Sequence, residues 1–399
     1  MGLNVKNLGR LAVGTAIKTV AKAASKLPRL DREYHIEERL SGPWPSDGPY
    51  LWLHGASLGE CRMLLGLAYA LQEDLSNCPK ILITSQKVEV VAFLKDSCAG
   101  AVEVAMAPAD VPSALHLFAS AVQPLGLILA ENELWPGYLS TMSKLSTRRN
   151  IALVSGRYRK SFPFINFAGM GYACMQTAAD LGRFTYASKG FVPCTMGGDW
   201  KLLNWARDGG LVCVPEKPEI DVVFLSFHQE EAEAFVAMAK DAVDKGESVV
   251  LMPRKLSELN LFRRLLNESE LPVVDYPSVE KGAVSLVTRF GLSREILLKS
   301  RSAVVGGSFD RRLGIHDFWE PLRMGVSTCV GPYAKGHDDV VAKLVDVHVV
   351  AQILSPADFL RRRHPSPDAV RTFLMGERMK VLNSYKLLLN FIKGIIRQR

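Results

Sequence analysis

The chain has 399 residues, of which 48% are hydrophobic and 23% charged, and a formal net charge of +8. This length exceeds what one hydrophobic core usually serves, so we expect two domains. The composition excludes a disordered, fibrous or solenoid protein. The positive charge is concentrated in residues 1–32 and 375–399, which favours an anionic membrane surface over a nucleic-acid groove.

The cysteines give no sign of a disulfide framework or a zinc site. Seven are scattered along the chain without a Cys-x-x-Cys pair. An odd, dispersed set is typical of reduced thiols in the cytoplasm. No Asp-rich metal motif is present either, so we predict no metal.

Residues 1–30 are predicted to form an amphipathic basic helix. Lys18, Lys22 and Lys26 recur at a spacing of four residues among apolar ones, and lysines interrupt every run long enough to cross a bilayer. Two interpretations stay open. The helix either lies on an anionic inner leaflet or packs on the protein with a solvated lysine face.

A strand, a turn and a helix are predicted in succession from residue 50. The apolar run 50–54 indicates a buried strand, residues 55–57 are small, and helical spacing follows from Leu58. Ser57 and Glu60 fit a capping box. Alternatively, Glu60 projects into a cleft at the carboxyl end of a parallel sheet as a general base.

Further apolar runs alternate with helical stretches and predict two doubly wound parallel sheets. The first series predicts a Rossmann-like domain over residues 45–205. Its apolar runs are 81–85, 102–106, 127–130 and 151–155. Residues 203–219 are predicted to be a linker. A second series predicts another Rossmann-like domain over 220–370, followed by a C-terminal helix at 371–399. The runs of the second series are 221–225, 248–252, 272–275, 283–288, 303–305 and 328–330.

Polar motifs follow several of these predicted strands. Residues 131–136, ENELWP, place two carboxylates before Trp-Pro; on their own they are also compatible with helix N-terminal acids. Residues 155–158 read SGRY, and residues 198–201 read GDWK. The strand-turn-helix segment contributes LHGASLGE at 53–60.

In this order the motifs resemble those of the bacterial Kdo transferases, which add 3-deoxy-D-manno-octulosonic acid to lipid A precursors. The family reads W-I-H-A-V-S-V-G-E, E-T-E-L-W-P-N, N-A-R-L and G-N-L-K-F-D at these places. The resemblance implies that Glu60 is the catalytic base, that Glu133 stabilises the transition state and that Lys201 stabilises the charge that develops as CMP leaves. Ser57 would contact substrate, and Arg157 either binds the sugar carboxylate or forms a structural salt bridge.

The second half resembles the nucleotide-binding half of the same family. SFHQEE at 226–231, Pro-Arg at 253–254, GGS at 306–308 and GIHDFWEP at 314–321 match family motifs. The resemblance implies that donor-binding residues are His228, Pro253, Arg254, Gly291, Gly306, Gly307, Ser308, His316, Asp317 and Glu320.

These residue types suit a nucleotide. Small residues at 306–308 would let backbone amides approach a phosphate, and Glu320 would accept hydrogen bonds from ribose hydroxyls. His228 is either a ligand group or a core histidine. The loop 314–321 is either a phosphate seat at a helix N-terminus or an ordinary turn. The chain departs from the family pattern at Leu292 and at residues 317–319, and a carboxylate at Asp317 beside a phosphate costs Coulomb energy.

The resemblance covers about residues 45–345 and implies the GT-B type of α/β fold, in which two Rossmann-like domains face each other across a cleft. We therefore predict a metal-independent glycosyltransferase, peripheral to the cytoplasmic face of the inner membrane. It would transfer Kdo or a related sugar acid from a CMP-sugar to a lipid A precursor in lipopolysaccharide core biosynthesis. It would need no cofactor and bind no nucleic acid. The alternatives are another CMP-sugar or acceptor, or a degenerate member that binds nucleotide or lipid without turnover.

Overall fold

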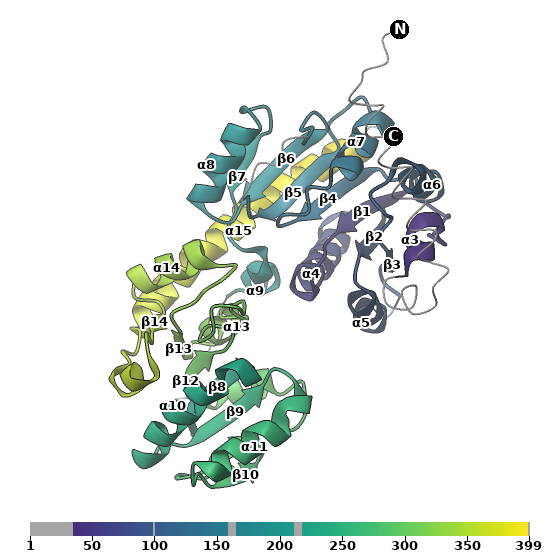
Figure 1. The fold of residues 1–399 in the computed structure, drawn as a ribbon. Helices are drawn as coiled ribbons and strands as arrows, with labels where there is room; N and C mark the ends of the chain where they lie inside the picture. The colour runs from purple at the N-terminus through teal and green to yellow at the C-terminus, as the bar shows by residue number, and fades with distance from the viewer. Residues whose placement is uncertain (1–34, 99, 159–164, 211–217, 398–399) are drawn as a thin grey trace. The chain divides into compact units, whose positions relative to one another are not determined.

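The computed structural model describes residues 35–98, 100–158, 165–210 and 218–397. The predicted helix at 1–30 lies outside these ranges. The chain divides into two compact units (Figure 1). The N-terminal unit contains the chain up to Arg207 together with Arg378–Arg399, and the C-terminal unit contains Asp208–Glu377.

The N-terminal unit is built on a seven-stranded parallel sheet in the order β3-β2-β1-β4-β5-β6-β7. The order reverses between β1 and β4, which is the switch point where ligands of such sheets bind. The central strands are continuous apolar runs because both faces of the sheet are covered. The strands are β1 Tyr50–His54, β2 Lys80–Ser85, β3 Glu103–Met106, β4 Gly126–Ala130, β5 Ile151–Gly156, β6 Met170–Met175 and β7 Cys194–Met196.

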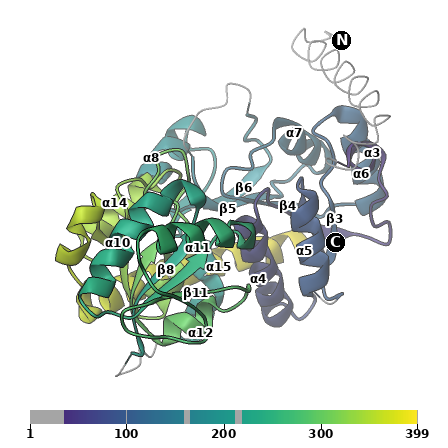
Figure 2. The same cartoon turned by 60° about the horizontal axis from the view of Figure 1, so that its bottom comes forward.

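Helices cover both faces of this sheet. α4 packs beside α5 and α9, and α6 packs against both α3 and α7. Figure 2 labels α4 and α5 in one part of this unit and α3, α6 and α7 in another. The core is aromatic near the switch point, where Trp52 lies with its ring centroid 4.5 Å from that of Phe118 and 4.9 Å from that of Tyr138. The helices are α3 Ile36–Ser41, α4 Leu58–Asp74, α5 Val88–Cys98, α6 Pro112–Val122, α7 Pro136–Leu145, α8 Ala178–Ala187, η1 Trp200–Leu202 and α9 Leu203–Arg207.

The C-terminal unit repeats the plan with a second seven-stranded parallel sheet in the order β10-β11-β9-β8-β12-β13-β14. Its switch point lies between β8 and β12. The strands are β8 Ile220–Phe227, β9 Val249–Pro253, β10 Val273–Asp275, β11 Val284–Leu286, β12 Ser300–Val305, β13 Ser327–Val330 and β14 Ala351–Gln352. The helices are η2 Gln229–Glu231, α10 Ala232–Asp244, η3 Leu256–Glu258, α11 Leu259–Glu268, α12 Ser293–Leu298, α13 Trp319–Arg323, α14 Asp338–Asp346 and η4 Pro356–Arg361.

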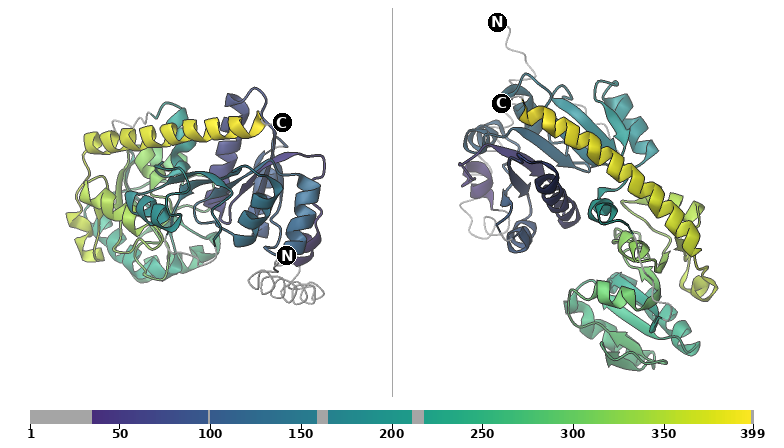
Figure 3. Two further views of the ribbon diagram at one scale, coloured as in Figure 1. Left: turned by 90° about the horizontal axis from the view of Figure 1, so that it is seen from above. Right: turned by 180° about the vertical axis from the view of Figure 1, so that it is seen from behind.

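The last helix, α15 Pro367–Ile396, begins in the C-terminal unit and ends in the N-terminal one. Its second half lies against the N-terminal sheet (Figure 3). There Ser384 Oγ accepts a hydrogen bond of 3.0 Å from Trp200 Nε1, and the Tyr385 hydroxyl donates one of 2.7 Å to Asp74. No helix within the described ranges is both long and apolar enough to cross a membrane.

Candidate active site

Glu60 lies in the first turn of α4, directly after the switch-point strand β1. Its backbone amide donates to Ser57 Oγ at 3.2 Å, while its carboxylate accepts from the Ser57 hydroxyl at 2.7 Å and from the Ala56 amide at 2.9 Å. The capping contacts expected for Ser57 and Glu60 are therefore present, and they fix the carboxylate in place. Burial, followed by the charges of Glu131 and Glu133, raises the pKa of Glu60 to about 7.

Glu131 follows β4, the strand next to β1, and was not among the predicted site residues. It has a left-handed backbone with a φ of 46°, and it is 6% exposed. Its carboxylate lies 2.8 Å from Arg157 Nη1 and 3.2 Å from Lys201 Nζ. Of the two interpretations of Arg157, the structure shows the salt bridge. Both cations therefore converge on one buried acid.

Glu133 lies two residues further on. Its Oε2 accepts a hydrogen bond of 2.6 Å from Trp135 Nε1 and is 3.5 Å from Nε2 of His54, the last residue of β1. Burial alone would raise the pKa of Glu133. The neighbouring His54 imidazole, together with the Trp135 N–H and the charge of Lys87, outweighs burial and lowers the pKa. Glu133 is thus kept as a carboxylate.

Lys201 lies in η1, and its ammonium group extends to Glu131. Asp199 caps this turn by accepting the Lys201 amide at 3.0 Å. The Lys201 ammonium lies 3.9 Å from where a Cβ of Gly59 would stand, beside Ser57 and Glu60 in the first turn of α4. The structure thus brings the predicted Glu60, Glu133 and Lys201 to one edge of the sheet. We call these three residues, with Glu131 and Arg157, the carboxylate centre.

The carboxylate centre can perform proton transfer. One acid has a pKa near neutrality, where a general base is most effective. Its neighbour Glu133 is held ionised by the hydrogen-bonding and positive groups around it, and Glu131 lies beside two cations. Perturbed acids at the switch point of an α/β sheet are typical of an active site.

In the C-terminal unit, the Gly306-Gly307-Ser308 loop follows β12, but its amides do not offer a phosphate seat. The buried Glu231 carboxylate accepts from the amides of Gly307, Ser308 and Phe309 at 2.8, 3.0 and 2.9 Å. The Gly306 amide donates to Leu225 in β8. In this structure a side chain of the same chain therefore binds these amides, and donor contact by residues 306–308 stays a prediction.

The glycines of this loop are required for packing. A Cβ on Gly306 would overlap the backbone of Ser226, and one on Gly307 would overlap the carbonyl of Gly314. Gly307 also has a φ of 74°, which disfavours other residues. The Ser308 hydroxyl donates to Val305 and accepts from the Gly331 amide at 2.8 Å. These contacts join the ends of β12 and β13.

His228 and His316 form a pair beside the same switch point. Their Nε2 atoms are 2.7 Å apart and their rings are stacked, with centroids 4.9 Å apart. Burial, followed by the charges of Arg254 and His228, lowers the pKa of His316 to about 3. His316 is therefore neutral near neutral pH. Arg254 is exposed and directly follows Pro253, the buried last residue of β9. We call His228, His316 and Arg254 the histidine cluster.

The loop before α13 is an ordinary capped turn. Asp317 Oδ1 accepts from the amides of Trp319 and Glu320 at 2.9 and 3.3 Å. The alternative of a phosphate seat at this helix N-terminus is thus not supported, since Asp317 occupies its first amides. Glu320 Oε1 accepts a hydrogen bond of 2.8 Å from Ser293, which follows a turn at Gly291 with a φ of 88°.

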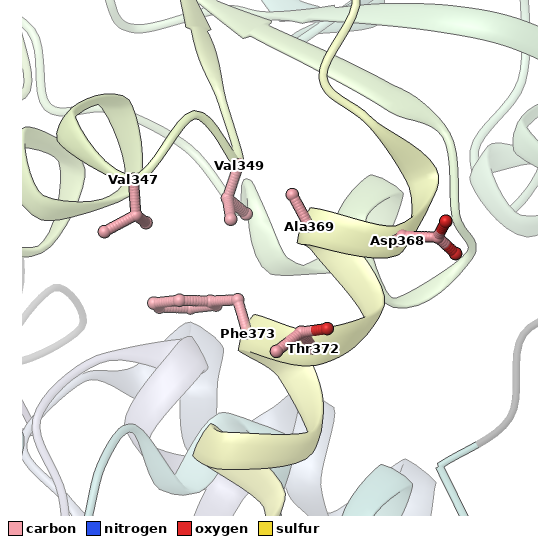
Figure 4. Close-up of a pocket in the computed structure, with 6 residues that line it drawn as sticks. All are labelled: Val347, Val349, Asp368, Ala369, Thr372 and Phe373. Carbon is pink, nitrogen blue, oxygen red and sulfur yellow. The ribbon is translucent and has the colours of Figure 1, made fainter.

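A separate pocket of about 420 Å³ lies where α15 begins (Figure 4). It shares no residue with the carboxylate centre or the histidine cluster. Its walls are mostly apolar, with one carboxylate, so it does not resemble a sugar or nucleotide site. The lining residues are Val347, Val349, Asp368, Ala369, Thr372 and Phe373.

Two Rossmann-like units, each with polar side chains at the switch point of a parallel sheet, have the fold of the GT-B type. A glycosyltransferase from Rickettsia africae has a similar fold, with a TM-score of 0.50 and 8% identity over 88% of this chain and 97% of that one. UDP-GlcNAc 2-epimerase from Neisseria meningitidis has a TM-score of 0.53 and 10% identity over 86% of this chain and 100% of that one. The predicted GT-B type is confirmed.

Sequence comparison adds the family. A family model described as 3-deoxy-D-manno-octulosonic-acid transferase (kdotransferase) matches residues 34–184. The Kdo transferase of Aquifex aeolicus is 26% identical over 73% of this chain and 78% of its own length. That of Haemophilus influenzae is 24% identical over 84% and 82%, respectively. These matches bear out the predicted resemblance to the Kdo transferase family, at low identity, over most of the chain.

Proposed function

We propose that the protein transfers Kdo, or a closely related sugar acid, from a CMP-sugar to a hydroxyl group of a lipid A precursor in lipopolysaccharide core biosynthesis. The observation that carries this proposal is the carboxylate centre. It places a near-neutral base, an ionised acid and two cations together within a unit most of which matches the family model.

In the proposed reaction, an acceptor oxygen forms a bond to the anomeric carbon of the sugar while the bond from that carbon to the CMP phosphate oxygen breaks. The hydroxyl proton passes to the Glu60 carboxylate, and CMP leaves with the electron pair. The negative charge of Glu133 stabilises positive charge that develops on the sugar ring. Lys201 and Arg157 supply positive charge near the anionic groups, so the mechanism invokes no metal.

The nucleotide would be held by the histidine cluster. Arg254 supplies a charge suited to a phosphate, and the neutral His316 can donate an N–H to it. Glu320, with Ser293, would accept hydrogen bonds from the ribose. This assignment replaces the 306–309 amides and the N-terminus of α13, since Glu231 and Asp317 already occupy those donors.

A lipid acceptor implies that the protein works at the cytoplasmic surface of the inner membrane. The concentration of positive charge towards both ends of the chain supports attraction to anionic headgroups. We propose a peripheral association of this kind.

A transferase for a different CMP-sugar is the second candidate. It is favoured by Asp317, which places a carboxylate in the loop where the family pattern has asparagine. Together with Glu320, Asp317 gives the loop 314–321 two carboxylates, and their charge would change which anionic CMP-sugar binds best.

Incubation with a panel of CMP-sugars and a lipid A precursor, read by mass spectrometry, tests both candidates. We expect a mass increase of one or more Kdo units with CMP-Kdo. A product only with another CMP-sugar would select the second candidate. Binding of CMP without product from any donor would show a degenerate member and refute the proposed activity.

A further inference from the structure

His54 is a buried polar side chain that the proposed chemistry does not yet use. It ends β1 and is 0% exposed. Its Nδ1 is 2.9 Å from Thr84 Oγ1, and its Nε2 is 3.5 Å from Glu133 Oε2. In the described part of the chain Nε2 has no closer hydrogen-bond partner. Since an unpaired buried nitrogen costs free energy, its direction toward Glu133 calls for an explanation.

Thr84 decides which ring nitrogen of His54 carries the hydrogen. Thr84 Oγ1 accepts a hydrogen bond of 2.8 Å from Trp52 Nε1, because an indole can only donate. The Thr84 hydroxyl hydrogen is then available to His54 Nδ1, and a neutral His54 carries its own hydrogen on Nε2. The other tautomer would direct a lone pair at the Glu133 carboxylate. The network therefore assigns an Nε2–H that faces Glu133.

The ring of His54 is held by rigid elements. His54 and Thr84 are register partners on the neighbouring strands β1 and β2. Tyr138 from α7 packs against the His54 ring with the centroids 5.1 Å apart and the planes at 78°. Because this surrounding is close-packed, the ring cannot turn away from Glu133 without disturbing the core.

Two effects follow for the carboxylate centre. The His54 N–H and the Trp135 N–H reach the same oxygen of Glu133 and together favour its charged form. The charge on Glu133 then contributes, after burial and Glu131, to the raised pKa of Glu60. Within the described ranges, the other titratable or charged groups that act on these two acids are Cys61, Lys87, Glu131 and Tyr138, while Arg157 and Lys201 bind Glu131.

We propose that His54 is a positioning residue of the transfer reaction: through Nε2–H it orients Glu133 and keeps it ionised, and thereby sets the basicity of Glu60. This inference rests on the proposed function. It assigns His54 no contact with substrate, and it requires only that the Thr84–His54–Glu133 chain stays intact.

Three variants separate this role from simple packing. His54→Leu removes the donor at similar size, His54→Gln keeps an amide N–H near the position of Nε2, and Thr84→Val removes the hydroxyl that orients the ring. With CMP-Kdo and a lipid A precursor, we expect His54→Leu to lower kcat about 10- to 100-fold with little change in KM, as for the loss of a hydrogen bond to a charged group. His54→Gln should restore most of the activity, and Thr84→Val should lie between. His116→Gln, on the exposed side of α6, is the matched control.

The pH dependence supplies the decisive readout. If His54 keeps Glu133 charged, the deficit of His54→Leu shrinks as the pH rises, because Glu133 then ionises without help. In parallel, ¹³C NMR of labelled glutamate carboxyls should show a higher titration midpoint for Glu133 in His54→Leu and Thr84→Val than in His54→Gln. A deficit equal at every pH, or an unchanged Glu133 titration, would overturn the inference.

The NMR titration does not depend on turnover. If the wild-type protein transfers no sugar, the proposed function fails, while the titration still decides the role of His54. Circular dichroism and thermal unfolding of each variant check that the fold is intact.

Discussion

Two carboxylates of the C-terminal unit accept hydrogen bonds from backbone amides that the sequence analysis assigned to a phosphate. Glu231 binds the amides at 307–309, and Asp317 binds the first amides of α13. The sequence could not show this, because the partner of a loop amide depends on how the ends of β8 and β12 lie against each other. The same side chains hold the loops beside the histidine cluster in one conformation.

Removal of the Glu231 carboxylate should therefore destabilise the C-terminal unit. Glu231→Ala removes the acceptor of four backbone amides, those of His228, Gly307, Ser308 and Phe309, and we expect a loss of unfolding free energy on the order of 3 kcal/mol or more. Urea unfolding followed by tryptophan fluorescence measures the change. Glu230→Ala, an exposed neighbour, is the control and should lie within about 0.5 kcal/mol of wild type. Equal stability of the two variants would contradict this role of Glu231.

Three residues of the carboxylate centre were predicted from the sequence motifs. Glu60, Glu133 and Lys201 meet at one edge of the sheet, as parallel topology requires of residues that follow neighbouring strands. Glu131 lay in the same motif and was missed. Its backbone turn at φ 46° directs it to Arg157 and Lys201, and no side-chain pattern encodes that turn.

At the scale of elements, the buried strands were the most predictable. The apolar run 50–54 coincides with β1, and the C-terminal helix predicted at 371–399 corresponds to α15, which spans Pro367–Ile396. β7 was not predicted, because a strand of three residues at the edge of the sheet has no apolar run long enough to recognise. Residues 203–207, predicted as linker, form α9, because burial of Leu203 and Ala206 outweighs the loop-like composition that follows.

α15 provides a test at this scale. The Tyr385 hydroxyl donates to Asp74 and accepts from Arg207 Nη1 at 3.1 Å. Tyr385→Phe should lower the unfolding free energy of the N-terminal unit by about 1 kcal/mol, because two part-buried hydrogen bonds are lost while the ring stays packed. Hydrogen exchange of α15 amides measures the loosening. Tyr333→Phe, an exposed site in the C-terminal unit, should have no effect, and equal exchange in both variants would contradict the contact.

At the scale of the molecule, both units follow one plan, with polar side chains gathered at the switch points β1/β4 and β8/β12. The alternation of strands and helices was enough to predict two Rossmann-like sheets, because each βαβ unit has a readable period. The arrangement of the two units across a cleft stays a prediction. The proposed proton transfer in the N-terminal unit and the proposed nucleotide binding in the C-terminal unit use separate sets of side chains.

The most direct test of this account is the pH dependence of kcat/KM for sugar transfer by the wild-type protein and by Glu60→Gln. The glutamine retains the capping contacts but cannot take a proton. Because the base must be ionised, the wild-type rate should fall as the pH drops through about 7, the raised pKa of Glu60. Glu60→Gln should lose at least about 100-fold at every pH with unchanged CMP affinity, while Glu103→Gln on the exposed start of β3 should match wild type. Wild-type turnover in Glu60→Gln would contradict the assignment of Glu60 as the base.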